Sequence, residues 1–169
     1  MLKIQMILTL SKVGEKFMQK KYLVFLLAAL VIMSCASTGG FSDIAGKDWK
    51  LLEVYVDVTF KREILFNRSE LSREGAGKFF TLKFNEEMVS GTGAPNLYSA
   101  PFTLGEDNAI TIMPMRSTLM ASTFQPEKLQ EHVFYFYMSN VYEWSVENKK
   151  LVVKSKTQDG SEVRMIFGR

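Results

Sequence analysis

Between residues 49 and 113, stretches in which hydrophobic and polar positions follow the period of two that is typical of β-strands are separated by turns. In the first such stretch, 49–58, one face carries Leu52, Val54, Val56 and Val58. Shorter runs of the same kind occur at 63–66, 79–84, 88–91, 97–104 and 109–113, with turn-forming residues between them. Residues 69–77 are polar with two glycines and are predicted to form a loop. We therefore expect a series of antiparallel strands, each with one buried face.

After Pro126 the period of the pattern changes. Residues of one face recur at spacings of four, three and four, namely Leu129, Val133, Phe136 and Asn140. This spacing predicts one amphipathic helix, with Pro126 in its first turn and its end at residues 139–140.

The chain then returns to strand patterns at 142–146, 151–156 and 162–167. The last two runs flank Asp159-Gly160, a dipeptide that favours a hairpin. About eight strands with a single helix late in the chain make an antiparallel α+β domain. The core residues that we expect are Trp49, Phe80, Leu82, Phe84, Val133, Phe136 and Phe167.

Residues 1–34 have the layout of a secretory signal peptide. Lys20-Lys21 directly precedes an apolar run at 22–33, which is too short for a membrane-spanning helix of about 20 residues. A start at Met18 would place the basic pair at the usual distance from the apolar run, so we expect Met18 to be the true start. The alternative interpretation is a core helix that ends at a buried cysteine.

The residues before Cys35, which are Ile32, Met33 and Ser34, resemble the lipobox of bacterial lipoproteins. In those proteins the cysteine receives a diacylglycerol on its sulfur and becomes the mature N-terminus. The resemblance implies a lipidated N-terminus and flexible tether at 35–45, which attaches a domain at 46–169 to a membrane. Ala36 is not the acidic residue that retains enterobacterial lipoproteins at the inner membrane. We therefore expect attachment to the outer membrane, facing the periplasm.

The net charge of +3 comes from the predicted signal peptide. Five of the 21 basic residues and one of the 18 acidic residues lie in 1–34, so the rest of the chain has 16 basic and 17 acidic residues. Such a balance provides no positive field for nucleic acid. One cysteine and one histidine also exclude an intrachain disulfide and multi-histidine metal sites. We expect a monomer that folds without metal, cofactor or disulfide.

The candidate catalytic groups have simpler structural explanations. His132 lies beside Glu131, but no motif places a nucleophile near it, so a surface or half-buried histidine is the better interpretation. The acidic pairs Glu86-Glu87 and Glu106-Asp107 fall in predicted turns and lack the spacing of a calcium loop. The sequence therefore does not favour an enzyme.

Four consecutive aromatic residues, 134–137, cover more than one face of the predicted helix. Core packing explains most of this run. The alternative is an exposed binding patch or the lining of a site for an apolar ligand.

Several short motifs follow one another in a defined order. They are Trp49 with Leu51, Val89-Ser90-Gly91, Gly93-Ala94-Pro95-Asn96-Leu97-Tyr98, Thr118-Leu119-Met120-Ala121-Ser122 and a final hairpin ending at Phe167. In these motifs, over nearly all of 47–167, the chain resembles the META domain family, also called the HslJ family. The resemblance implies a strongly curved antiparallel sheet with one helix packed on it. A surface shared by the family motifs would comprise Gly91, Gly93, Pro95, Asn96, Tyr98, Thr118, Met120 and Ser122.

Family members often have cysteines where this chain has Pro95 and Ser122. The resemblance thus implies that the two motif loops lie side by side at one end of the sheet, with Pro95 close to Ser122. A structural clasp explains the turn residues of these loops without any ligand, and a binding site is the alternative.

This family is found in bacterial envelope lipoproteins and heat-induced proteins. The resemblance implies a non-enzymatic envelope lipoprotein that binds a protein partner or supports envelope integrity under stress. The alternative is an apolar-ligand or pilotin-like carrier that uses the concave sheet as a cup.

Overall fold

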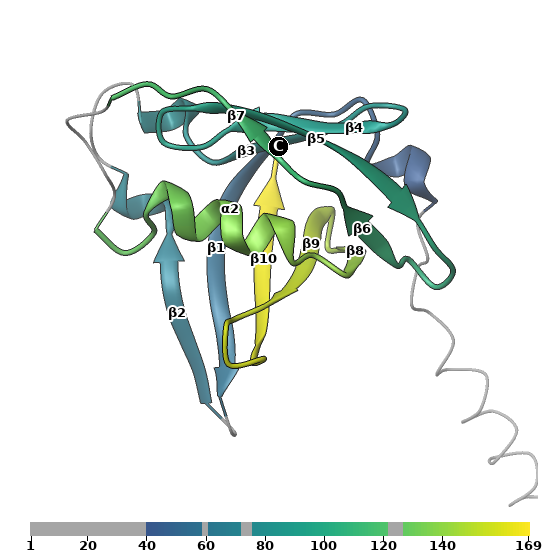
Figure 1. Cartoon of the computed structure of the whole chain (residues 1–169). Coiled ribbons are helices and arrows are strands. Elements are labelled where there is room, and N and C mark those ends of the chain that lie inside the picture. The colour runs from purple at the N-terminus through teal and green to yellow at the C-terminus, as the bar shows by residue number, and fades with distance from the viewer. Residues whose placement is uncertain (1–39, 59–60, 72–75, 122–126) are drawn as a thin grey trace, which may run out of the picture. The chain divides into compact units, whose positions relative to one another are not determined.

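The computed structural model describes residues 40–58, 61–71, 76–121 and 127–169, all within the unit Thr38–Arg169 (Figure 1). The elements in chain order are η1 (Phe41–Asp43), β1 (Trp49–Val58), β2 (Lys61–Asn67), η2 (Arg68–Glu70), η3 (Ala76–Lys78), β3 (Thr81–Phe84), β4 (Met88–Thr92), β5 (Leu97–Leu104), β6 (Ile110–Ile112), β7 (Arg116–Ser117), α2 (Glu131–Ser139), β8 (Glu143–Glu147), β9 (Lys150–Lys156) and β10 (Glu162–Gly168). The predicted α+β class is confirmed. The described residues form ten strands rather than about eight, because the short strand β7 was not predicted and the sequence pattern contains nine runs.

All ten strands belong to one antiparallel sheet of order β6-β5-β4-β3-β1-β10-β9-β8, to which β2 adds on β1 and β7 adds on β5. Its two end strands approach each other where Ala109 bridges Glu143 and the Ile110 amide donates to the Tyr142 carbonyl at 3.1 Å. The sheet is therefore strongly curved, as expected, but is not closed by a continuous ladder.

A β-bulge in β1 corrects the predicted face of the first strand. The pairing of β1 with β10 shifts register between Leu51 and Glu53, so that Leu52 is the extra residue. Leu51 and Val54 are consequently fully buried, whereas Leu52 is only half-buried. The alternating sequence at 52–58 did not reveal this bulge. Burial does not alternate strictly beyond it either, since Val54, Tyr55 and Val56 are all buried.

Helix α2 packs across the concave side of the sheet, below β3 and β5 in the view of Figure 1. Its Phe134 ring lies 5.1 Å from the Phe80 ring and 5.8 Å from the Tyr98 ring, measured between centroids. Ser155 on β9 donates a hydrogen bond of 2.6 Å to the carbonyl of Tyr137. The helix therefore fills the concavity of the sheet with aromatic side chains.

The helix begins later than predicted, and a different face is buried. It starts at Glu131, and its buried residues are Phe134, Tyr137 and Met138. Leu129 is buried but precedes the helix, so counting it as helical shifted the predicted face onto Val133 and Phe136, which are only half-buried. Pro126 lies outside the described residues. The other five predicted core residues are confirmed as buried: Trp49, Phe80, Leu82, Phe84 and Phe167.

Arg68 links the segment after β2 to the rest of the sheet. Its guanidinium donates to the carbonyl of Leu51 at 2.7 Å, to that of Gly77 at 2.7 Å and to that of Phe79 at 3.2 Å and 3.1 Å. Burial lowers the pKa of this side chain. In place of the simple loop predicted at 69–77, this region thus contains two short 3-10 turns held by one arginine.

The burial pattern of α2 predicts the energetic ranking of its aromatic residues. Phe134→Ala should reduce the free energy of unfolding by about 3–5 kcal/mol, because it leaves a cavity among rings that cannot collapse fully. The matched change Phe136→Ala should cost clearly less, because its side chain is half-buried. Urea unfolding of the two variants measures this ranking. Equal losses, or a larger loss for Phe136→Ala, would contradict the assigned face.

Candidate functional site

The first turn of α2 carries a carboxylate that accepts four hydrogen bonds. Oε1 of Glu131 accepts from the amide of Ala94 at 2.6 Å, the amide of Asn96 at 2.7 Å and the hydroxyl of Tyr135 at 3.2 Å. Oε2 accepts from Nδ2 of Asn96 at 2.7 Å. This one side chain therefore satisfies two backbone donors of the loop between β4 and β5 and joins that loop to the helix.

Asn96 extends the connection to the segment after β7. Its Oδ1 accepts from the hydroxyl of Thr118 at 2.9 Å and from the amide of Met120 at 2.5 Å. The Thr118 hydroxyl also accepts from the amide of Leu97 at 3.1 Å. The two motif loops thus lie side by side. We call the group Asn96, Thr118, Met120 and Glu131 the polar clasp.

The two motif glycines are required by close approaches around the polar clasp. A Cβ on Gly93 would lie 2.5 Å from both Oε1 of Glu131 and the hydroxyl of Tyr135. A Cβ on Gly91 would collide with the backbone carbonyl of Thr81 and approach the Tyr98 ring to 2.9 Å. Neither position has room for a side chain, which explains both glycines without a ligand.

Two tyrosines next to the polar clasp are held in their neutral form. Tyr98 is buried and donates to the carbonyl of Thr81 at 2.8 Å, and burial raises its pKa, with a smaller contribution from Tyr135. Burial also raises the pKa of Tyr135, reinforced by the charge of Glu131 and by their hydrogen bond. Both hydroxyls therefore act as permanent donors near neutral pH.

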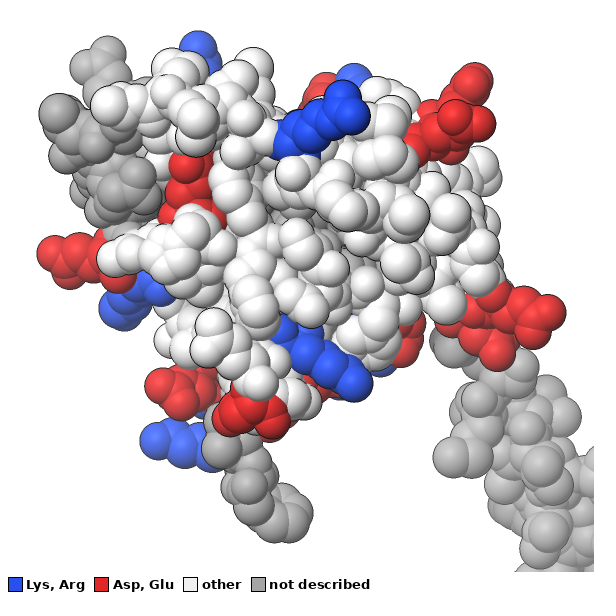
Figure 2. Space-filling view, in the orientation of Figure 1, with Lys and Arg blue, Asp and Glu red and all other residues white. Residues whose placement is uncertain are grey.

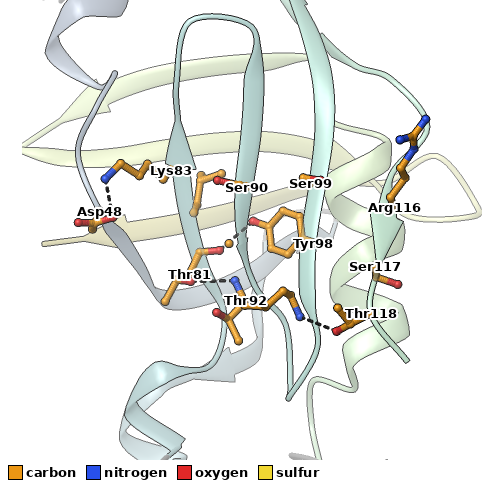
Figure 3. A pocket seen from close by; sticks show the side chains of 13 residues that line it. Asp48, Thr81, Lys83, Ser90, Thr92, Tyr98, Ser99, Arg116, Ser117 and Thr118 are labelled. Carbon is orange, nitrogen blue, oxygen red and sulfur yellow. Dashed lines mark hydrogen bonds and ion pairs between the residues drawn. The ribbon is translucent and has the colours of Figure 1, made fainter. Parts of the chain in front are cut away.

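A groove of about 600 Å³ lies on the outer face of β3, β4, β5 and β7 (Figure 3). Cross-strand pairing aligns Lys83 with Ser90, Ser90 with Ser99, and Ser99 with Arg116. Paired residues of antiparallel strands point to the same side of the sheet, so the four side chains form one row across the groove. We call this set the cross-strand row. Figure 3 shows Lys83 and Arg116 at opposite ends of it.

The groove offers hydrogen-bonding groups that the protein does not use. Among the described residues, no side-chain hydrogen bond involves the hydroxyls of Ser90, Thr92, Ser99 or Ser117, and Arg116 has no ion pair. Lys83 pairs with Asp48 at 3.3 Å, and both side chains remain partly exposed. Leu97, which is 58% exposed, adds an apolar element to the lining. The groove therefore combines apolar surface with unused hydroxyl groups and has a cation at each end.

A second groove, of about 630 Å³, runs between α2 and the turn from β9 to β10. It contains His132, Val133 and Phe136 on the helix, opposite Thr157 and Asp159. His132 is exposed there, as expected. The aromatic run at 134–137 is thus divided: Phe134 and Tyr137 enter the core, Tyr135 joins the polar clasp, and Phe136 lines this second groove.

Six of the predicted family-motif residues belong to the polar clasp or lie next to it: Asn96, Thr118 and Met120 are members, and Gly91, Gly93 and Tyr98 are neighbours. Pro95, after a cis peptide bond, is half-buried in the same loop. Ser122 lies outside the described residues, so its closeness to Pro95 stays a prediction. Cys35 lies outside them as well.

Sequence reasoning did not identify Glu131, the acceptor on which the polar clasp depends. The available signal was an acidic residue next to the helix start, where the helix dipole favours negative charge. That signal is common, and it could not indicate four donors from distant segments.

The remaining charged candidates occupy the places expected for turns. Glu86, Glu87, Glu106 and Asp107 are all exposed. In the part of the chain that the structure describes, no three or more His, Cys, Asp or Glu side chains gather as a metal site. On the face seen in Figure 2, acidic and basic side chains are interspersed around a broad uncharged area. None of the helices in the described segments has the length and hydrophobicity to span a membrane.

Comparison with known proteins identifies the family. The sequence profile of the META domain matches residues 42–166, which is most of the chain, so the protein belongs to the META domain family. No curated protein matches the chain in sequence.

Two solved structures share the fold. One is the NMR structure of a protein from Burkholderia xenovorans, with 14% identity and a TM-score of 0.51, covering 74% of this chain and 83% of that one. The other is the crystal structure of a DUF4847 family protein from Bacteroides vulgatus, with 11% identity and a TM-score of 0.51, covering 75% of this chain and 96% of that one. At these identities the likeness concerns the fold alone.

The polar clasp predicts that Glu131→Gln is destabilising although the side chains have the same shape. The amide nitrogen cannot accept, so at least one donor from the loop loses its partner, and each such buried group costs about 1–3 kcal/mol. Glu127→Gln is the matched control, because Glu127 is exposed. Urea unfolding compares the two variants, and equal stability would show that the hydrogen bonds of Glu131 contribute little.

Burial of Tyr98 predicts a loss of stability at alkaline pH. Its raised pKa means that the folded protein keeps this proton when the unfolded chain, with a tyrosine pKa of about 10, loses it. This contribution is therefore complete below pH ~10 and decreases above it by at most about 1.4 kcal/mol per pH unit. Tyr98→Phe should flatten the decline measured by urea unfolding from about pH 9 to 11. An identical slope in the variant would contradict the assignment.

Proposed function

We propose that the protein is a non-enzymatic envelope lipoprotein whose META domain is a binding module. The observation that carries this proposal is the structural role of the Glu131 carboxylate. Its carboxylate lies among the family-motif residues, and its oxygens are occupied by four donors from the protein itself. A group engaged in this way holds loops together and is a poor general base, because a base needs a free lone pair directed at its substrate.

The proposed anchor is a diacylglycerol on Cys35. Its support is the order of features in the sequence: a basic pair, an apolar run of limited length, a small residue and then the cysteine. The polar residues that follow would form a short tether to the folded domain. Ala36 supports attachment to the outer membrane on its periplasmic side, where the domain would meet envelope partners or support envelope integrity under stress.

The packing of α2 favours a binding module over an apolar-ligand carrier. A carrier that used the concave sheet as a cup would need an open cavity there. Phe134 and Met138 have no exposed surface on that side, and Phe80 and Phe84 are equally buried. A cup already filled to this extent leaves no space for a lipid chain without rearrangement of the core.

The proposed lipid anchor is tested by removing the Cys35 sulfur that would carry the diacylglycerol. On expression in a Gram-negative host, the wild-type chain should yield a shortened species that partitions into detergent and carries a diacylglycerol on Cys35. Cys35→Ser should yield only the unprocessed precursor, because no thiol is present for acylation. Ser37→Ala is the matched control and should be processed normally. A processed, detergent-partitioning form of Cys35→Ser would refute the anchor, and mass spectrometry of the N-terminal peptide distinguishes the species.

A further inference from the structure

We propose that the groove over β3, β4, β5 and β7 binds a short acidic oligosaccharide, with its carboxylate at Arg116 and its hydroxyls along Ser99 and Ser90. The inference rests on the proposed function, since it names the ligand class of the proposed binding module. It concerns the groove on the outer face of the sheet, which Thr118 of the polar clasp also lines, whereas Asn96, Met120 and Glu131 do not line it.

The length of the cross-strand row indicates an extended ligand. Adjacent strands are about 4.8 Å apart, so the backbone of Lys83 on β3 and that of Arg116 on β7 are separated by roughly 14 Å. A single small anion would meet only one of the two cations. A chain of several sugar units can contact both ends and the serines between them.

The chemistry of the row indicates hydroxyl groups in the ligand. Ser90, Thr92, Ser99 and Ser117 each offer a hydroxyl that both donates and accepts, and none is used within the described residues. A partner that fully satisfies such groups must itself donate and accept repeatedly, as sugar hydroxyls do. The exposed Leu97 provides an apolar contact for the C–H face of a sugar ring.

The charges at the two ends of the row differ in character. Lys83 is compensated by Asp48, so this end provides a donor and an acceptor side by side, which suits a neutral hydroxyl. Arg116 has no ion-pair partner among the described residues, and a guanidinium binds a carboxylate through two parallel hydrogen bonds. The acidic group of the ligand is therefore assigned to the Arg116 end. In the middle of the groove the ligand must be recognised by side chains, because the backbone groups of β3, β4 and β5 are already paired with one another there.

The test is calorimetric titration of the full chain, purified in detergent, with tri-galacturonic acid as the acidic saccharide. Maltotriose serves as the neutral saccharide, tetraglutamate as an acidic peptide and inorganic phosphate as a simple anion. We expect binding of tri-galacturonic acid that weakens with salt, and much weaker binding of the other three probes. Arg116→Gln should lower the affinity for tri-galacturonic acid about tenfold or more. Ser99→Ala should lower this affinity to a smaller extent. Arg62→Gln removes an exposed arginine on β2, outside the groove, and should leave binding unchanged.

Several results would overturn the inference. These are the absence of tri-galacturonic acid binding, equal binding of tetraglutamate or phosphate, and binding that Arg116→Gln leaves unchanged. A folding defect is separated from a binding defect by the urea unfolding curve of each variant. The anchor is tested independently, because Cys35→Ser should bind the saccharide as the wild type does. A wild-type chain that is lipidated but does not bind the saccharide would refute only the ligand, whereas a wild-type chain that binds the saccharide but carries no lipid would refute only the anchor.

Discussion

The structure depends on one half-buried carboxylate that accepts hydrogen bonds from a loop with no strand partner. Between β4 and β5 the chain leaves the ladder, and Glu131 accepts from the amides of both Ala94 and Asn96. Backbone donors that are removed from water must find partners, so the helix has to start where this carboxylate reaches them. The position of α2, and hence the burial of Phe134 beneath Phe80, follows from that requirement.

The polar clasp and the groove are connected through β7. This strand has only two residues, and its pairing with β5 is too short to be stable alone. Directly after it, Thr118 and Met120 are held by the side chain of Asn96. Arg116 therefore stands at the edge of the groove because the family-motif residues beneath hold the next segment in place. In this protein the motif forms the scaffold, and the adjacent outer face is free for recognition.

The local sequence pattern predicted which elements form better than it predicted which face of each element is buried. Runs of alternating residues located nine of the ten strands, and Asp159-Gly160 located the last hairpin, because these signals depend only on near neighbours along the chain. The bulge at Leu52 and the non-helical Leu129 were missed. In both cases an apolar residue fitted the local pattern although the backbone places it outside the regular element. Including that residue shifted the predicted buried face.

By itself the sequence determined the α+β class, the order of strands and helix and the family, because periodicity, turn residues and motif order are local properties. It also identified most of the core, since large apolar residues at strand period have few other places to go. The tertiary structure alone decided the partners of Glu131, Asn96 and Arg68, which join segments far apart in the chain. It alone decided the cross-strand row as well, because the row depends on the register of β3, β4, β5 and β7 against one another. A serine or an arginine carries no local sign of which side chain will lie beside it on the neighbouring strand.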